Sequence, residues 1–375
     1  MKKIFFLLSF MHVGGVEKSF LGLLSIIPPN KYEIHLGLLS MQGELLNHIP
    51  PHVHVHHINC YDKYKWIINR PPLEVIKEFC KQKQFFSAFI RLLLHIFYKL
   101  TSNSYYLYKW LLKDELTFPE KFDIAISYAG PSQSLDYYVC KKIKATEKYG
   151  WIHFDISQFG IDKGMTKKLY KAYKKIYIVS ESAKKKFDEI FPEFKTKTEV
   201  FYNIISIEEI QKQAINGPTF TDDFQGIRIL TVGRLSYEKG QDIAINTLKH
   251  LIENANSTNK YNIRWYFIGD GKDRLEFEQL AKNLNISENV SFLGIQNNPY
   301  KFMKDCDIYV QPSRHEGYCI TLAEAKCFDN PIIATNFTGA EEQLNSHSNC
   351  YICKETTNAM VAAIQNAISN LNHKK

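Results

Sequence analysis

Residues 316–325 read EGYCITLAEA and follow an apolar run, IYVQP, at residues 308–312. The apolar run predicts a strand, and the segment after it predicts a loop that leads into a helix. In parallel α/β sheets, ligands bind in the crevice at the carboxyl ends of the strands. We therefore expect Glu316 and Glu324 at a ligand site, where their carboxylates accept hydrogen bonds from hydroxyl groups such as those of a sugar nucleotide.

Near-continuous apolar runs recur along the whole chain, with helical patterns between them. Such runs are typical of strands that are covered on both faces, as in parallel sheets flanked by helices. The expected strands lie at residues 4–9, 33–40, 53–59, 123–128, 149–153 and 175–180 in the first half, and at 228–232, 263–268, 290–293, 307–311 and 331–335 in the second.

The segment at residues 216–223, NGPTFTDD, interrupts both patterns and predicts a linker. It divides the chain into two α/β halves. We expect an N-terminal domain at 1–205, a linker at 206–226, a C-terminal domain at 227–356, and a C-terminal helix at 357–375 that packs back toward the N-terminal domain.

Composition limits the classes of function. The chain has 375 residues, 45% of them apolar, which suffices for two domains with substantial cores. The net charge of +8 suits phosphorylated ligands or an anionic membrane surface and does not by itself indicate nucleic acid. The apolar run near the start is short and ends at His12 without a cleavage signal, so we expect a cytoplasmic protein with eight free cysteines.

The region at residues 77–113 is helical in pattern, rich in Phe, Tyr and Leu, and interspersed with Lys and Arg. One interpretation is a pair of helices that packs on the first sheet. The other is a basic and aromatic face that rests on the inner face of the cytoplasmic membrane. The sequence leaves both open.

Two loops of the second half carry groups suited to a diphosphate. The strand at 228–232 ends in Gly233, and the loop after it carries Arg234 and Lys239 to the start of a helix. Both cations then lie at the carboxyl edge of the sheet, and a helix N-terminus also favours anions. The next strand runs into a tight turn, Gly269-Asp270-Gly271, which is not a dinucleotide-binding G-x-G-x-x-G fingerprint. A later strand ends at Leu293, where a base could stack on the backbone or form hydrogen bonds with it.

Taken together, these motifs resemble the retaining glycosyltransferases of family 4. The series is GRL…EKG at 233–240, GDG at 269–271, FLG at 292–294, and the pair Glu316…Glu324. The N-terminal half matches more loosely, through GGVEK at 14–18 and WIH at 151–153. The resemblance implies the GT-B architecture, in which two facing Rossmann-like domains with parallel sheets enclose a donor site in a cleft.

The resemblance also implies roles for individual residues. Arg234 and Lys239 would bind the donor diphosphate, Glu324 the ribose hydroxyls, and Glu316 the transferred sugar. Gly15 would let the first loop approach the phosphates, and His153 would lie near the sugar. The catalytic set is then Glu316, His153, Arg234 and Lys239, and the donor-binding set is Gly15, Arg234, Lys239, Gly269, Asp270, Gly271, Leu293, Glu316, Gly317, Ile320, Thr321, Leu322 and Glu324.

Tyr318-Cys319 and Lys326 depart from the family pattern and leave the donor sugar open. Three groups could suggest a metal or redox site and have simpler interpretations. They are Cys350 with Cys353 as a short strand, Asp305 with Asp307 at a helix-to-strand junction, and His52, His54 and His56 as the polar face of an edge strand.

The resemblance implies a hexosyltransferase of the EC 2.4 class. It would move a sugar from a nucleotide-diphosphate donor, UDP-sugar favoured and GDP-sugar possible, to a glycan or lipid-linked acceptor in cell-surface polysaccharide biosynthesis. No cofactor and no essential metal are expected, and the partners are the nucleotide sugar, the acceptor and an anionic membrane. The alternatives are a non-catalytic nucleotide-sugar-binding scaffold and a GT-B sugar-nucleotide epimerase.

Overall fold

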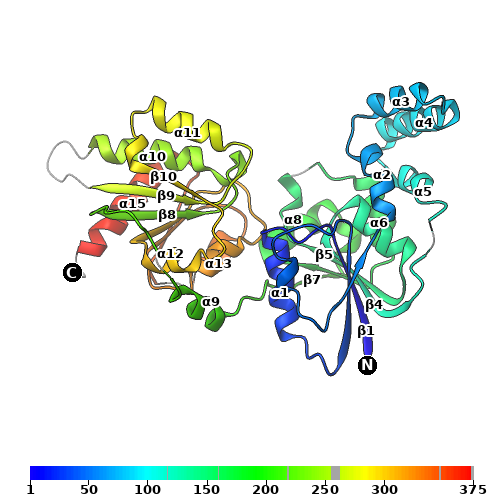
Figure 1. Cartoon of the computed structure of the whole chain (residues 1–375), viewed down its shortest axis with the longest axis horizontal. Coiled ribbons are helices and arrows are strands. Elements are labelled where there is room, and N and C mark those ends of the chain that lie inside the picture. Colours follow the sequence, from blue (N-terminus) through cyan, green and yellow to red (C-terminus); the bar gives the residue numbers. More distant parts are fainter. Residues whose placement is uncertain (116, 159, 218, 255–261, 346–347, 373–375) are drawn as a thin grey trace. The chain divides into compact units, whose positions relative to one another are not determined.

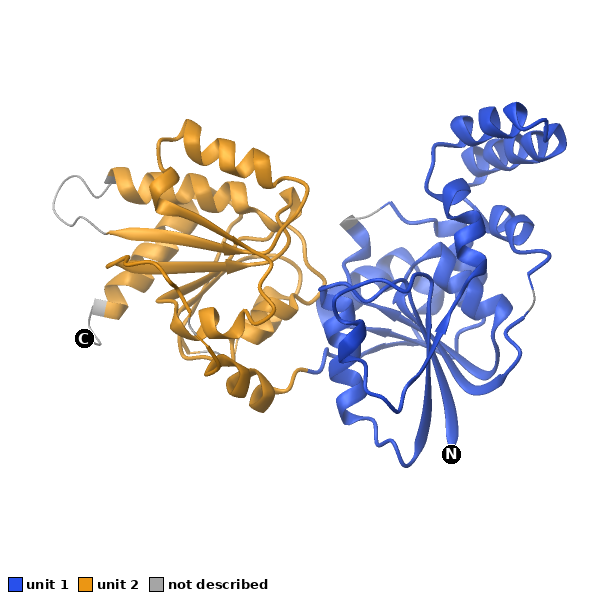
Figure 2. Cartoon of the chain, viewed as in Figure 1, with its two compact units in different colours: residues 1–204 blue, residues 205–375 orange. Residues whose placement is uncertain are grey.

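The computed structural model describes residues 1–115, 117–158, 160–217, 219–254, 262–345 and 348–372. The chain forms two compact units, residues 1–204 and 205–375, which Figure 2 colours blue and orange. The division falls close to the expected end of the N-terminal domain at residue 205. Pro218 of the expected linker and residues 373–375 of the expected C-terminal helix lie outside the described residues.

The first unit is built on a parallel sheet with the strand order β3-β2-β1-β4-β5-β6-β7. Helices cover the sheet, as the apolar character of its strands requires (Figure 1). Its strands are β1 (Lys2–Leu8), β2 (Tyr32–Leu38), β3 (His54–His57), β4 (Lys121–Gly130), β5 (Lys144–Ile152), β6 (Lys175–Ile178) and β7 (Thr198–Val200), and its helices are α1 (Gly15–Ile26), α2 (Cys60–Ile68), α3 (Pro72–Lys81), α4 (Phe85–Thr101), α5 (Tyr105–Leu111), α6 (Gln133–Lys142), α7 (Lys163–Tyr170) and α8 (Glu181–Ile190).

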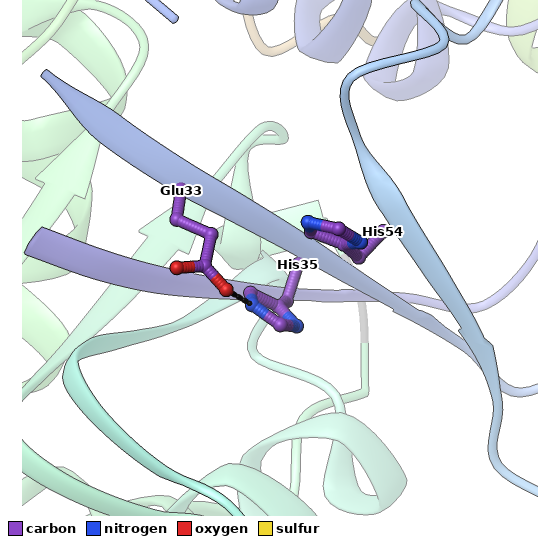
Figure 3. A group of neighbouring side chains, drawn as sticks. All are labelled: Glu33, His35 and His54. Atoms are coloured by element: carbon purple, nitrogen blue, oxygen red, sulfur yellow. Dashed lines mark hydrogen bonds and ion pairs between the residues drawn. The ribbon is translucent and has the colours of Figure 1, made fainter. Parts of the chain in front are cut away.

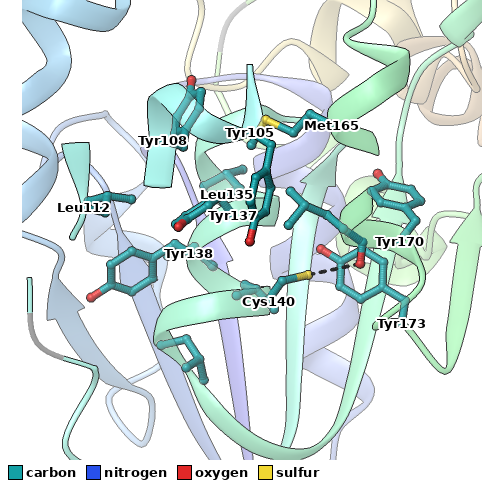
Figure 4. Close-up of a cluster of buried hydrophobic side chains, with 14 of the residues drawn as sticks. Tyr105, Tyr108, Leu112, Leu135, Tyr137, Tyr138, Cys140, Met165, Tyr170 and Tyr173 are labelled. Atoms are coloured by element: carbon teal, nitrogen blue, oxygen red, sulfur yellow. Dashed lines mark hydrogen bonds between the residues drawn. The ribbon is translucent and has the colours of Figure 1, made fainter. Parts of the chain in front are cut away.

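Tyrosine dominates the part of the first core that lies beneath α5, α6 and α7. Figure 4 shows Tyr105 and Tyr137 in this cluster, with ring centroids 5.5 Å apart. Tyr173 donates a hydrogen bond of 2.6 Å to Asp136, a buried carboxylate. Burial raises the pKa of Asp136 to about 6, although its hydrogen-bond donors oppose the shift.

The region at residues 77–113 forms three helices, and they do not behave alike. α5 buries Tyr105, Tyr108 and Leu111 in the core, as the first interpretation of this region expects. α4 buries only Ala88 and Arg91 of its 17 residues. Figure 1 shows α3 and α4 side by side, away from the sheet of their unit. α4 is therefore not a helix packed on the first sheet.

The second unit is built on a parallel sheet with the order β10-β9-β8-β11-β12-β13. The order reverses between β8 and β11, and this reversal is the switch point at which such sheets bind ligands. Its strands are β8 (Ile227–Val232), β9 (Ile263–Ile268), β10 (Val290–Gly294), β11 (Ile308–Gln311), β12 (Ile332–Thr335) and β13 (Cys350–Cys353), and its helices are α9 (Ile207–Ala214), α10 (Gln241–Asn254), α11 (Arg274–Asn283), α12 (Tyr300–Asp305), α13 (Ile320–Ala325), α14 (Ala340–Leu344) and α15 (Thr357–Asn372).

Two segments of this unit differ from expectation. The expected linker contains helix α9, whose first turn is capped where the Ser206 hydroxyl accepts a hydrogen bond from the amide of Glu209. Helix α15, expected to pack toward the N-terminal domain, buries Met360 and Ile364 in the core of its own unit, because its apolar stripe faces α10 and the sheet. In the described part of the chain, no helix is long and apolar enough to cross a membrane.

Candidate functional site

The site of the second unit is assembled from the loops that follow β8 and β11, the two strands on either side of the switch point. Lys239 comes from the first loop and Glu316 from the second. The Lys239 ammonium lies 2.6 Å from the Glu316 carboxylate, with side chains 27% and 9% exposed. The Ser313 hydroxyl donates a second hydrogen bond of 2.8 Å to the same oxygen. The structure thus brings together two predicted residues that lie 77 positions apart.

Charge pairing holds Lys239 in its cationic form. Burial alone would lower the pKa of Lys239, but attraction to the Glu316 carboxylate outweighs it and the pKa is raised. The ammonium has three donors, and one of them contacts Glu316. Among the described residues no other acceptor contacts it, so two donors remain for an anion at the carboxyl edge of the sheet.

Arg234 lies in the same loop and is exposed. Its carbonyl accepts a hydrogen bond from Gln241, which fixes the backbone of the loop. Within the described part of the chain, its guanidinium takes part in no ion pair. Arg234 is therefore placed to attract an anionic ligand, while Lys239 is already held in position.

A clamp that the sequence did not reveal joins the two loops. The Arg314 guanidinium donates two hydrogen bonds of 2.7 Å to the two carboxylate oxygens of Asp242 and stacks on the Tyr237 ring at 3.9 Å. The Arg314 amide also donates to the Glu238 carbonyl. Bidentate pairs of this kind fix orientation as well as distance. Arg314 and Asp242 lie 72 residues apart, so no local pattern could have paired them.

Two glycines allow the loops to approach one another. Gly240 has φ +69, and a Cβ there would lie 2.0 Å from the Pro312 carbonyl oxygen. Gly269 has φ +133, and a Cβ there would lie 2.1 Å from the Gly233 carbonyl oxygen. Any other residue would strain the backbone and collide with the neighbouring loop. The predicted turn at 269–271 thus packs directly against the loop that carries Arg234.

Glu324 lies in α13 and is 2% exposed. One of its carboxylate oxygens accepts a hydrogen bond of 2.9 Å from the Tyr300 hydroxyl, which comes from α12. Burial and the neighbouring carboxylate raise the pKa of Tyr300, so its hydroxyl stays protonated as a donor. Tyr300 is a second residue that sequence reasoning missed.

The turn into α13 carries the residues that depart from the family pattern. Cys319 has φ +63, a left-handed conformation that is uncommon for a residue with a side chain. Burial raises the pKa of its thiol, which favours the protonated form. Gly317 is buried beside it, and Ile320, Thr321 and Leu322 form the first turn of α13, as predicted. Asp270 follows β9, and Leu293 lies near the end of β10. Both are therefore at the carboxyl edge of the second sheet.

The two site residues predicted in the first unit lie at the carboxyl ends of its strands. Gly15 begins α1 after β1, and His153 follows β5 directly. His153 stacks on Trp151 and contacts the Tyr128 ring at 4.6 Å. Burial lowers the pKa of His153 to about 3, against smaller opposing effects of Tyr128 and Asn203. Its imidazole is therefore neutral.

The candidate metal groups also have clear positions. Figure 3 shows Glu33, His35 and His54, whose possible metal-ligand atoms lie within 4.8 Å of one another. Of the expected set His52, His54 and His56, only His54 belongs to this group, and the other histidine is His35 of β2. His35 already bonds Glu33 at 2.9 Å, and the Lys3 ammonium lies 3.1 Å from the same carboxylate oxygen. Asp307 accepts the amide of Arg228 at the opposite, amino end of its sheet.

All eight cysteines are free, as the sequence led us to expect. Cys350 and Cys353 lie in strand β13, which is the interpretation given to them above.

Residues 223–375 match the family described as glycosyl transferases group 1. An uncharacterized glycosyltransferase of Methanocaldococcus jannaschii is 34% identical over 187 residues, which cover 48% of this chain and 44% of that protein. A Campylobacter jejuni N-acetylgalactosaminyltransferase that acts on a diphospho-undecaprenol-linked sugar is 29% identical over 174 residues, 45% of this chain and 44% of that protein. The chain thus spans less than half the length of these two relatives.

Solved structures resemble the whole chain. Anabaena HepE in complex with UDP-glucose has a TM-score of 0.66 at 16% identity, over 99% of this chain and 91% of that chain. TarM has a TM-score of 0.64 at 14% identity, over 99% and 92%. These likenesses establish the GT-B fold that the sequence predicted. Residues 223–375 thus match the group 1 glycosyltransferase family, and the chain has the GT-B fold.

Proposed function

We propose that this protein is a retaining glycosyltransferase that moves a hexose from a nucleotide-diphosphate sugar to a glycan or lipid-linked acceptor. UDP-sugars are the favoured donors. The observation that carries this proposal is the Lys239–Glu316 pair at the switch point of the second sheet. Arg234, which has no ion pair among the described residues, lies in the same loop as Lys239. Relatives named for O-antigen biosynthesis and for transfer to a lipid-linked sugar support a role in cell-surface polysaccharide synthesis.

Each side chain has a task in this reaction. Arg234 and Lys239 would bind the donor diphosphate and offset the charge that grows on the leaving phosphate. Cations that are positioned before the reaction stabilise that charge most when water is excluded. Glu316 would orient the transferred sugar, and Glu324, held by Tyr300, would bind the ribose hydroxyls. His153, a neutral imidazole, would contact the sugar as a hydrogen-bonding group.

The proposed reaction uses no metal ion, because Arg234 and Lys239 take the place that a divalent cation would have at the diphosphate. Activity should therefore persist after treatment with EDTA and gel filtration. Activity that is lost with EDTA and restored by a divalent cation would contradict this part of the proposal.

A donor screen tests the function itself. The full chain is incubated with UDP-, GDP- and ADP-sugars, and binding is followed by thermal shift and turnover by release of the nucleoside diphosphate. We expect a UDP-sugar to stabilise the protein and to be hydrolysed slowly in the absence of acceptor. Tight binding with no hydrolysis and no transfer would favour a non-catalytic scaffold, and conversion of the donor sugar without release of nucleotide would favour an epimerase.

A further inference from the structure

Helix α4 (Phe85–Thr101) presents an apolar stripe to solvent. Phe86, for example, is 77% exposed. The stripe recurs at intervals of three and four residues, which places its members on one face of a helix. We call this face the α4 stripe, and it consists of Phe85, Phe86, Phe89, Leu92, Leu93, Ile96, Phe97 and Leu100.

The α4 stripe has the opposite orientation to that of an ordinary amphipathic helix. In a globular protein the apolar face of a helix turns toward the core. Here the buried positions of α4 are Ala88 and Arg91, on the other side of the helix. α3 and α4 form a hairpin that contacts the rest of the unit at two places. Phe79 of α3 packs edge-on against Trp66 and Trp110, and Phe97, near the end of the α4 stripe, packs edge-on against Tyr106 of α5. A contiguous exposed apolar face of this kind marks an interaction surface.

The surrounding charges select the partner. Residues 79–113 contain no Asp or Glu and six cations, and the first part of α3 adds Glu74, Glu78 and Lys77. Two copies of the stripe packed on each other would bring these like charges together, whereas an anionic lipid surface attracts each of them within about a Debye length. Arg91 is buried in the hairpin and has no ion-pair partner in the described part of the chain. The six cations are Lys81, Lys83, Arg91, Lys99, Lys109 and Lys113.

We propose that the α3–α4 hairpin docks on an anionic lipid bilayer, with the α4 stripe among the acyl chains and the flanking cations at the headgroup phosphates. The stripe runs the length of the helix, so α4 lies in the plane of the interface rather than end-on. Docking needs no donor and no turnover. The further step, that it brings the chain to a lipid-linked acceptor, rests on the proposed function.

Vesicle sedimentation of the full chain tests the docking. Wild type should sediment with phosphatidylglycerol-containing vesicles and much less with pure phosphatidylcholine vesicles. The variant Phe86→Ser/Phe89→Ser/Leu93→Ser should bind at least about tenfold more weakly, because each buried CH₂ group adds to interfacial affinity. Lys81→Gln/Lys83→Gln/Lys99→Gln should weaken binding only to the anionic vesicles and should reduce its dependence on salt.

Matched controls separate docking from folding and from catalysis. Leu275→Ser changes an apolar side chain that is 78% exposed on α11 of the other unit and should bind vesicles like wild type. All variants should keep the circular dichroism spectrum of wild type and its thermal stabilisation by UDP. If the proposed function is wrong, the stabilisation by UDP will be absent, whereas the sedimentation with vesicles will be unaffected. Vesicle binding that is equal in wild type and the triple serine variant would overturn the proposal. So would a wild-type dimer that ignores vesicles and dissociates in that variant.

Discussion

Substitution of Lys239 by Met tests whether the site works as a prearranged charge pair. Met keeps the length of the side chain and removes the ammonium, which leaves the Ser313 hydroxyl as the donor to this oxygen of the Glu316 carboxylate. Removing one partner of a fully buried pair costs about 3–5 kcal/mol. Because Lys239 is partly exposed, we expect about 1–3 kcal/mol of lost stability. Transfer should fall by about 10²–10³-fold, the effect of removing one preorganised charge-stabilising group.

The double variant Lys239→Met/Glu316→Gln separates the structural role of the pair from its chemical role. Gln restores neutrality, so most of the lost stability should return, whereas transfer should stay low because the phosphate contact is still missing. Stability is measured as the urea midpoint and transfer as the initial rate of nucleotide release. The matched control is Lys249→Met. It breaks an i,i+4 pair with Glu253, whose side chain is 53% exposed, and should cost less than about 0.5 kcal/mol with no loss of transfer.

Two outcomes would refute this reasoning. One is wild-type turnover in a folded Lys239→Met protein, and the other is turnover that returns together with stability in the double variant. Either would mean that the pair holds the two loops together and does not act on the donor.

Glu324→Gln keeps an oxygen that accepts the Tyr300 hydrogen bond but removes the negative charge. The affinity for UDP, measured by calorimetry, should fall about 10–100-fold, while the thermal midpoint stays near that of wild type. An unchanged affinity would exclude Glu324 as the ribose ligand. Arg314→Lys cannot form both bonds to Asp242, so the thermal midpoint and UDP affinity should fall together, and a fall in neither would show that the clamp is dispensable. Because the folded-state pKa of His153 is lowered to about 3, its contribution to stability is present above the unfolded pKa of about 6.5 and is lost as pH falls below it. Wild type should therefore lose about 2 kcal/mol more than His153→Gln between pH 7 and pH 5, measured by urea denaturation, and equal losses would refute the buried neutral state.

The strands and their functional edge could be predicted because parallel strands leave a local signal. A strand such as β9 (Ile263–Ile268) is a continuous apolar run that ends in glycine, and its position needs no knowledge of its neighbours. β7 (Thr198–Val200) was missed because it is three residues long and lies at the edge of the sheet. Helix α9 was missed inside the expected linker, although Ser206 and Glu209 have the spacing of a capping box.

Side-chain partners between distant elements left no such signal. The bond between Arg314 and Asp242 depends on the spatial order of β8 and β11, which is set by the whole sheet. The same holds for His35, which approaches the histidines of β3 only through the register of two strands. The periodic apolar pattern of α4 is equally consistent with a core helix and with an exposed one. The sequence predicts that the apolar side chains share one face of α4, and only the tertiary structure shows that this face is exposed to solvent.

The candidate site of the second unit was the more predictable part, because its residues lie at the ends of strands that follow one another along the chain. To place a candidate residue at the carboxyl edge, it was enough to recognise the strand that precedes it in the sequence. What the structure adds is a difference between the two cations. Lys239 is held by Glu316 and stays charged although it is partly buried, whereas Arg234 is exposed and has no ion-pair partner in the described part of the chain. We therefore expect Arg234 to govern capture of the donor, with a strong dependence on salt, and Lys239 to govern the chemical step, with little dependence on salt.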